Sequence, residues 1–267
     1  MSDTQQLKAE EQKQHILEEI MSDFVFYQHP DLLKKEYSSL LDVSKANLGG
    51  IKKYTELFSN LRYAWQKTLK YRLYFEHFYP PTEERVDKIE ALNHHIHAYL
   101  QDMTILKNKI EVLLGEMKND INKIASNKSN IDSFCRAGVE KTKEVFAGIT
   151  EHRDEHHHRG RRFFDGDLLK AENAHSFLET LSNPIVDAML NQERKPELIA
   201  KYTVQREESF EAAKKRWIET AQRNDEQTTG FLETLLKRVR APLYQFLHII
   251  PAQEHFTSVM RQKQNQK

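Results

Sequence analysis

The chain has 267 residues, and its 40 lysine and arginine residues balance 40 aspartate and glutamate residues. Such a chain is no general binder of polyanions, so affinity for nucleic acid would need a local patch. The single cysteine, Cys135, excludes an internal disulfide, and no apolar run reaches the ~20 residues that a membrane span needs. Since the first residues also lack the basic and apolar segments of a secretion signal, we expect a cytoplasmic protein without membrane partners.

Residues that lose little freedom in a helix dominate the composition, and no strand pattern stands out, so we expect an all-α fold. The first 80 residues form an N-terminal block with three predicted helices: about 5–26, 31–44 and 51–78. Gly49-Gly50 is predicted to be a flexible joint, and Pro80-Pro81 ends the block. Aromatic residues from Trp65 to Tyr79 have helical spacing, which is more typical of a core or an interface than of a surface that stacks bases.

A heptad seam is the strongest structural pattern. Its apolar residues alternate three and four apart: Ile89, Leu92, Ile96, Tyr99, Met103, Leu106, Ile110, Leu113 and Met117. The seam predicts an elongated helical bundle with one long helix over about 82–124, ~60 Å in length and the longest of the chain. Its partner is another helix of the chain or the same helix of a second subunit. We expect a homodimer that buries part of this seam or the surface around His158.

The rest of the chain is predicted to be helical up to a mobile tail at 251–267. One helix after Asn130 is expected to turn five apolar residues inward: Ile131, Phe134, Val145, Phe146 and Ile149. Asp167 is expected to cap the next helix. The remaining predicted helices are about 168–181, 184–190, 196–223 and 228–247. These elements give a central domain at 82–190 and C-terminal helices at 191–250.

Arg153-Asp154-Glu155-His156-His157-His158 is the candidate chemical site. A guanidinium stays charged and suits phosphate oxygens, whereas an imidazole exchanges protons near neutral pH. Together they can cut a phosphodiester without a metal. The same spacing recurs at Arg72 and His77, but a leucine follows Arg72, and we interpret that match as coincidence.

Other basic and histidine clusters have competing interpretations. A second basic patch combines two groups: Lys237, Arg238 and Arg240, and the basic tail residues Arg261, Lys263 and Lys267. We prefer to interpret this patch as a solvated helix face with a basic terminus. Three histidines lie beside the heptad seam: His94, His95 and His97. We interpret them as residues of the polar flank of the helix in preference to metal ligands. Two further hypotheses stay open for the site cluster of His152 and His156–His158: a zinc site, and a surface cluster without chemistry. No cofactor is expected.

The Arg153-Asp154-x-x-x-His158 sequence resembles the Arg-polar-x-x-x-His signature of HEPN domains, which are small helical bundles found in toxin–antitoxin, abortive-infection and other prokaryotic defence systems. The order of parts is also similar: a long helix with a heptad-like face, a second helix that ends in the motif, and a following helix. The resemblance covers roughly residues 84–190. The second motif position is aspartate instead of the commoner asparagine, and the chain is longer than an isolated HEPN domain.

The resemblance implies a metal-independent endoribonuclease. His158 would move protons, Arg153 would stabilise the charge that grows on the phosphate, and Asp154 would orient one of them. Three arginines would bind the flanking RNA backbone: Arg159, Arg161 and Arg162. The implied partners are an RNA substrate, a second subunit and a protein such as an antitoxin. The alternative is a non-catalytic, all-helical interaction or scaffold protein in which Arg153 pairs with Asp154, Glu155 or Asp165.

Overall fold

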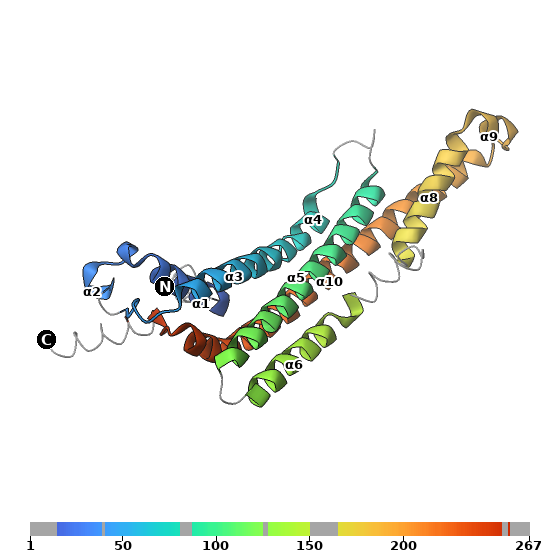
Figure 1. The fold of residues 1–267 in the computed structure, drawn as a ribbon. Coiled ribbons are helices and arrows are strands. Elements are labelled where there is room, and N and C mark those ends of the chain that lie inside the picture. Colours follow the sequence, from blue (N-terminus) through green and yellow to red (C-terminus); the bar gives the residue numbers. More distant parts are fainter. Residues whose placement is uncertain are drawn as a thin grey trace, which may run out of the picture. The chain divides into compact units, whose positions relative to one another are not determined.

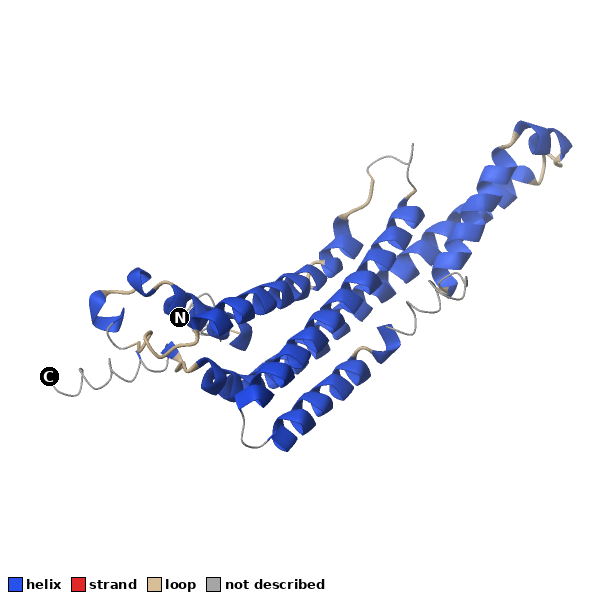
Figure 2. Cartoon of the chain, in the orientation of Figure 1, coloured by secondary structure: helices blue, strands red, loops and turns tan. Residues whose placement is uncertain are grey.

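The computed structural model describes residues 15–38, 41–80, 87–124, 128–149, 165–252 and 256. Every regular element within these ranges is a helix (Figures 1 and 2), so the predicted all-α class is confirmed. The elements are α1 (Ile16–Gln28), the 3-10 helix η1 (Pro30–Leu32), α2 (Lys35–Ser38), α3 (Leu48–Thr68), α4 (Tyr71–His77), α5 (Lys88–Ile124), α6 (Lys128–Val145), α8 (Gly166–Ser182), α9 (Pro184–Met189) and α10 (Lys195–Leu247). None of these described helices combines the length and apolar character that crossing a membrane requires.

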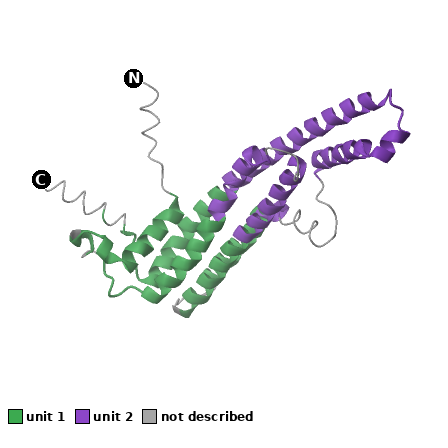
Figure 3. Ribbon diagram, turned by 90° about the horizontal axis from the view of Figure 1, so that it is seen from above, with its two compact units in different colours: residues 1–64, 107–145, 228–267 green, residues 65–106, 146–227 purple. Residues whose placement is uncertain are grey.

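The chain divides into two compact units (Figure 3). Unit 1 comprises residues 1–64, 107–145 and 228–267, and unit 2 comprises residues 65–106 and 146–227. Three helices contribute residues to both units: α3, α5 and α10. Each unit therefore combines stretches that are distant in sequence, whereas the sequence predicts consecutive blocks. Contacts between distant helices define a unit, and such contacts leave no local composition signal.

The longest described helix is α10, with 53 residues against 37 in α5, so the prediction for the longest helix is wrong. The predicted helices at 196–223 and 228–247 are parts of this one helix. The intervening run from Asn224 to Gln227 is polar, but it contains neither glycine nor proline, and its backbone continues the helix. In unit 2 the Asn224 amide donates to the Tyr99 hydroxyl at 3.0 Å, which gives this polar side chain a partner.

Gly49-Gly50 lies in the first turn of α3 and does not form the predicted joint. The Asn47 side chain caps the helix, because its Oδ1 accepts from the Gly50 N–H at 2.9 Å. A Cβ atom on Gly50 would lie 2.7 Å from Leu247 Cδ2, closer than real Cβ atoms come to a neighbour. The missing side chain of Gly50 thus lets Leu247 pack close to α3. Two other N-terminal predictions also differ from the structure. The described residues of the predicted helix at 31–44 hold only the end of η1 and α2, and the predicted helix at 51–78 is interrupted between α3 and α4.

The heptad seam is buried within a single chain, since every one of its residues is at most 3% exposed. A homodimer would therefore have to use another surface. The buried face of α6 differs from the expected one, because it is lined by small residues: Cys135, Gly138 and Thr142. A Cβ on Gly138 would lie 3.0 Å from Leu114 Cδ1, so the missing side chain lets α6 approach α5. Phe146 is fully buried as predicted, whereas the other expected inward residues are only half-buried: Ile131, Phe134, Val145 and Ile149.

Buried aspartates recur in both units, each hydrogen-bonded to an aromatic side chain and paired with a cation: Asp23, Asp102, Asp120 and Asp165. In unit 1, Asp23 accepts from the Tyr244 hydroxyl at 2.6 Å and contacts Arg240 at 3.4 Å. Burial still raises the pKa of the Asp23 carboxyl, against the lowering effect of these partners. A buried carboxylate is costly unless it is paired, so these networks fix which helices meet.

Candidate functional site

The predicted catalytic residues lie outside the described residues: Arg153, Asp154 and His158. The same holds for the predicted RNA-binding arginines and the neighbouring histidines: Arg159, Arg161, Arg162, His152, His156 and His157. The structure describes both flanks of this segment. Phe146 is fully buried on one side and Asp165 is 5% exposed on the other, and both belong to unit 2. The flanks of the predicted site are therefore anchored in the same unit.

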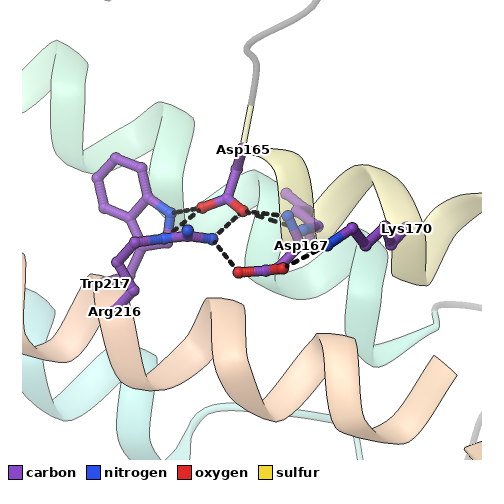
Figure 4. Close-up of polar contacts among 6 residues, drawn as sticks. Asp165, Asp167, Lys170, Arg216 and Trp217 are labelled. Carbon is purple, nitrogen blue, oxygen red and sulfur yellow. Dashed lines mark hydrogen bonds and ion pairs between the residues drawn. The ribbon is translucent and has the colours of Figure 1, made fainter. Parts of the chain in front are cut away.

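Asp165 caps α8, two residues before the predicted cap Asp167 (Figure 4). Its Oδ1 atom accepts from the backbone N–H groups of Asp167 and Leu168, both at 3.0 Å. Asp167 instead lies in the first turn of α8, where its negative charge faces the positive end of the helix dipole. The Phe-Asp-Gly-Asp sequence offers two aspartates as possible caps, so sequence alone locates the start of the helix only to within one turn.

Two side chains of α10 complete the contacts of Asp165 (Figure 4). Trp217 donates from Nε1 to Oδ2 at 2.9 Å. Arg216 binds both carboxylate oxygens, with its Nε 3.2 Å from Oδ2 and its second amino group on Oδ1. The same amino group contacts Asp167 Oδ2 at 3.0 Å. A two-pronged arginine–carboxylate pair is both strong and directional.

Every acceptor site that a carboxylate offers is taken at Asp165, which accepts five hydrogen bonds. Asp165 is therefore a poor candidate for a general base, and it already has an arginine partner in Arg216. The scaffold hypothesis names Asp165 as one possible partner of Arg153, and the described contacts weaken that option. Sequence analysis missed the roles of Arg216 and Trp217, because residues separated by 51 and 52 positions share no local pattern.

Two residues of the second basic patch form ion pairs within unit 1. Arg240 is 15% exposed and contacts Glu19 at 3.3 Å and Asp23 at 3.4 Å. Lys237 pairs with Glu233 at 2.8 Å, one turn earlier on α10. Arg238 remains exposed, and the basic tail residues lie beyond the described range: Arg261, Lys263 and Lys267. These pairs favour a structural role for the patch over binding of nucleic acid.

Unit 2 contains a shallow groove of about 400 Å³ that holds a histidine and an arginine. Its lining residues are His175, Leu178, Glu179, Ser182, Asn183 and Arg206. His175 Nδ1 lies 2.8 Å from Asp87 and 3.5 Å from Arg206, and its Nε2 lies 3.5 Å from Glu179. Arg206 also contacts Glu207 at 3.4 Å. Sequence analysis missed this pair, but the surrounding carboxylates oppose binding of a phosphate.

Histidines in the described ranges do not form a metal centre. No group of three or more histidine, cysteine, aspartate or glutamate residues suited to a metal ion occurs there. His95 donates from Nε2 to the Phe78 carbonyl oxygen at 2.7 Å, and His94 is exposed on the same helix. The coincidental pair, Arg72 and His77, lies exposed on α4. His77 therefore provides a described surface control for His158.

Comparison with known proteins gave no match, whether against protein-family models, curated protein sequences or solved structures.

Proposed function

We propose that this protein is a metal-independent endoribonuclease of HEPN type, with Arg153, Asp154 and His158 as its catalytic residues. The observation that carries the proposal is the Arg-polar-x-x-x-His sequence itself. The order of the described helices supports it: the long α5, then α6, then α8 after the motif. The occupied carboxylate of Asp165 adds support, because it weakens one of the pairings by which Arg153 would be purely structural.

The roles follow from the chemistry of RNA cleavage. His158 removes the proton from the ribose 2′-hydroxyl or delivers one to the leaving 5′-oxygen, while Arg153 stabilises the negative charge on the phosphate. Asp154 orients one of these side chains. The 2′-oxygen bonds to phosphorus as the bond to the 5′-oxygen breaks, which leaves a 2′,3′-cyclic phosphate and a 5′-hydroxyl. DNA lacks the nucleophile and stays intact.

The assay is cleavage of end-labelled single-stranded RNA by the pure protein in EDTA. Positioned proton transfer contributes about 10²–10⁴-fold, so His158→Ala should lose most activity. Arg153→Lys should also fail, because an ammonium keeps the charge but loses the two-pronged contact with phosphate. His77→Ala, a change at an exposed histidine of α4, should leave the rate unchanged.

Two further variants separate this site from its competitors. His156→Ala would damage a zinc site and should affect a HEPN-type site much less. His175→Ala removes the described histidine of the groove and should preserve cleavage. Equal cleavage by wild type and His158→Ala would contradict the proposal, as would loss of activity on adding EDTA alone. Selective loss in His175→Ala would assign the chemistry to the groove.

The proposed partners are an RNA substrate, a second subunit and a protein such as an antitoxin, in toxin–antitoxin or phage defence in the cytoplasm. Arg159, Arg161 and Arg162 would bind the RNA backbone. Sedimentation over a range of concentrations tests the homodimer. Because the heptad seam is buried within one chain, the second subunit is proposed to bind a different surface.

A non-catalytic interaction protein is the second candidate, and exposed apolar residues near α9 favour it. Ile185 is 74% exposed and Met189 is 82% exposed, and Ile199 and Val204 follow at 39% and 54% in the first turns of α10. Exposed apolar side chains can mark a binding surface. A scaffold leaves RNA intact under every condition of the cleavage assay, so that assay decides between the two candidates.

A further inference from the structure

The outer face of α4 and its two caps carry a stripe of aromatic, apolar and basic residues: Lys70, Leu73, Tyr74 and Phe78. Their spacing of three, one and four residues is that of a single helix face. Phe78 is 60% exposed and Leu73 is 51% exposed, although each is large and apolar. We call these four residues the α4 stripe.

The rings of the α4 stripe are held in place by the residues behind them. Tyr74 contacts Phe78 edge to face, with their centroids 5.1 Å apart, and lies 6.2 Å from His95 at an interplanar angle of 31°. His95 is itself fixed by its 2.7 Å hydrogen bond to the Phe78 carbonyl. Behind Tyr74, the buried Tyr71 donates to Asp102 at 2.5 Å. The exposed rings are therefore preorganised, so little conformational freedom remains to be lost on binding.

The charge around the α4 stripe suits a polyanion. Lys70 forms no ion pair with any residue that the structure describes. Glu76, which contacts His77 at 3.5 Å, is the one acidic residue of α4. Asp102 is the one aspartate, glutamate, lysine or arginine among residues 91–105, and it is paired with Lys67 at 2.8 Å. This is notable in a chain of which 30% of the residues are charged.

We propose that the α4 stripe binds single-stranded RNA by stacking unpaired bases on Phe78 and Tyr74, with Lys70 contacting a backbone phosphate. Every base has a π-face, so stacking on aromatic side chains tolerates any sequence, and cations track the phosphates. Aromatic rings beside a lysine on a convex helix face match a nucleotide strand better than a peptide helix, which needs an apolar groove. The choice of RNA as the substrate class rests on the proposed function, whereas the stacking surface itself does not.

The test is a binding measurement that does not depend on cleavage. Fluorescence anisotropy of a labelled 12-nucleotide oligouridine is followed in EDTA with His158→Ala protein, so that the probe stays intact. One stacked base contributes about 1–3 kcal/mol, which predicts an affinity roughly 5- to 150-fold lower for Phe78→Ala. Phe78→Tyr should retain binding, because the ring remains. Lys70→Gln should make the affinity less dependent on salt concentration, by the amount that about one phosphate contact contributes.

Tyr63→Ala is the matched control, because Tyr63 is 71% exposed on α3 and belongs to unit 1. Equal binding by Phe78→Ala and Tyr63→Ala would overturn the inference. Conversion of a dimer to a monomer by Phe78→Ala, with RNA affinity unchanged, would also overturn it and assign the stripe to a second copy. If the wild-type protein binds RNA through Phe78 but does not cleave it, this inference is upheld and the proposed function is rejected. If cleavage depends on His158 but Phe78→Ala binds RNA normally, the proposed function is upheld and this inference is rejected.

Discussion

Asp165→Ala tests whether the network of Figure 4 holds α8 onto α10. The substitution removes a helix cap, which costs ~1 kcal/mol. It also leaves the indole N–H of Trp217, which is 6% exposed, without its acceptor, at about 1–3 kcal/mol. Arg216 is 47% exposed and can be solvated, so its lost pair adds at most about 1 kcal/mol. We expect the free energy of unfolding to fall by about 2–5 kcal/mol.

Urea unfolding, followed by helical circular dichroism and by tryptophan fluorescence, measures this change. The chain holds two tryptophans, and Trp217 belongs to the network itself. Asp165→Asn keeps a capping oxygen, but its NH2 group replaces the Oδ2 atom that accepts from Trp217, so it should still cost about 1–3 kcal/mol. Asp167→Ala removes only the exposed contacts to Arg216 and Lys170, and should cost less than about 1 kcal/mol. If Asp165→Ala were no less stable than Asp167→Ala, the argument for an anchor at Asp165 would be refuted.

Three more predictions concern backbone strain, packing and pH. His248 ends α10 with φ at 54°, a conformation that favours glycine, so His248→Gly should stabilise the protein by about 1 kcal/mol in thermal unfolding; a lower Tm would show that the imidazole contributes more than the strain costs. Gly138→Val should destabilise by about 1–3 kcal/mol, because even its Cβ would meet Leu114 at 3.0 Å, and an unchanged urea midpoint would mean that α6 can shift freely. Burial raises the pKa of Asp225 to about 7, against the lowering effect of Arg72. Because the pKa of Asp225 is raised in the folded state, its carboxyl contributes stability to the protein below about pH 4, and this contribution is lost as the pH rises through about 7. Asp225→Asn should therefore be more stable than wild type at pH 8, by about 1–2 kcal/mol after allowance for its partial exposure, and that advantage should shrink towards pH 4; a constant difference across this range would contradict the assignment.

The sequence was most informative where a pattern is local and periodic. The heptad spacing from Ile89 to Met117 predicts a buried helix face, and every residue of that seam is buried. The predicted helix at 184–190 is α9, which begins at Pro184, and the Asn183 side chain caps it by accepting from the Ile185 N–H at 2.9 Å. Boundaries marked only by polarity failed, because the run from Asn224 to Gln227 lies inside α10. Polar residues are compatible with a helix, whereas proline and glycine oppose it more strongly.

The sequence by itself determined the all-α class, the buried face of α5 and the Arg153-to-His158 motif, because composition, helical period and residue order are all local properties. Only the tertiary structure decided that Asp165 binds Arg216 and Trp217, that small residues line the buried face of α6, and that Phe78 remains exposed while Tyr71 is buried. These outcomes depend on which helices meet. That choice is made by side-chain volume and by the pairing of buried charges between residues far apart in sequence, and it leaves no trace in any short stretch of the chain.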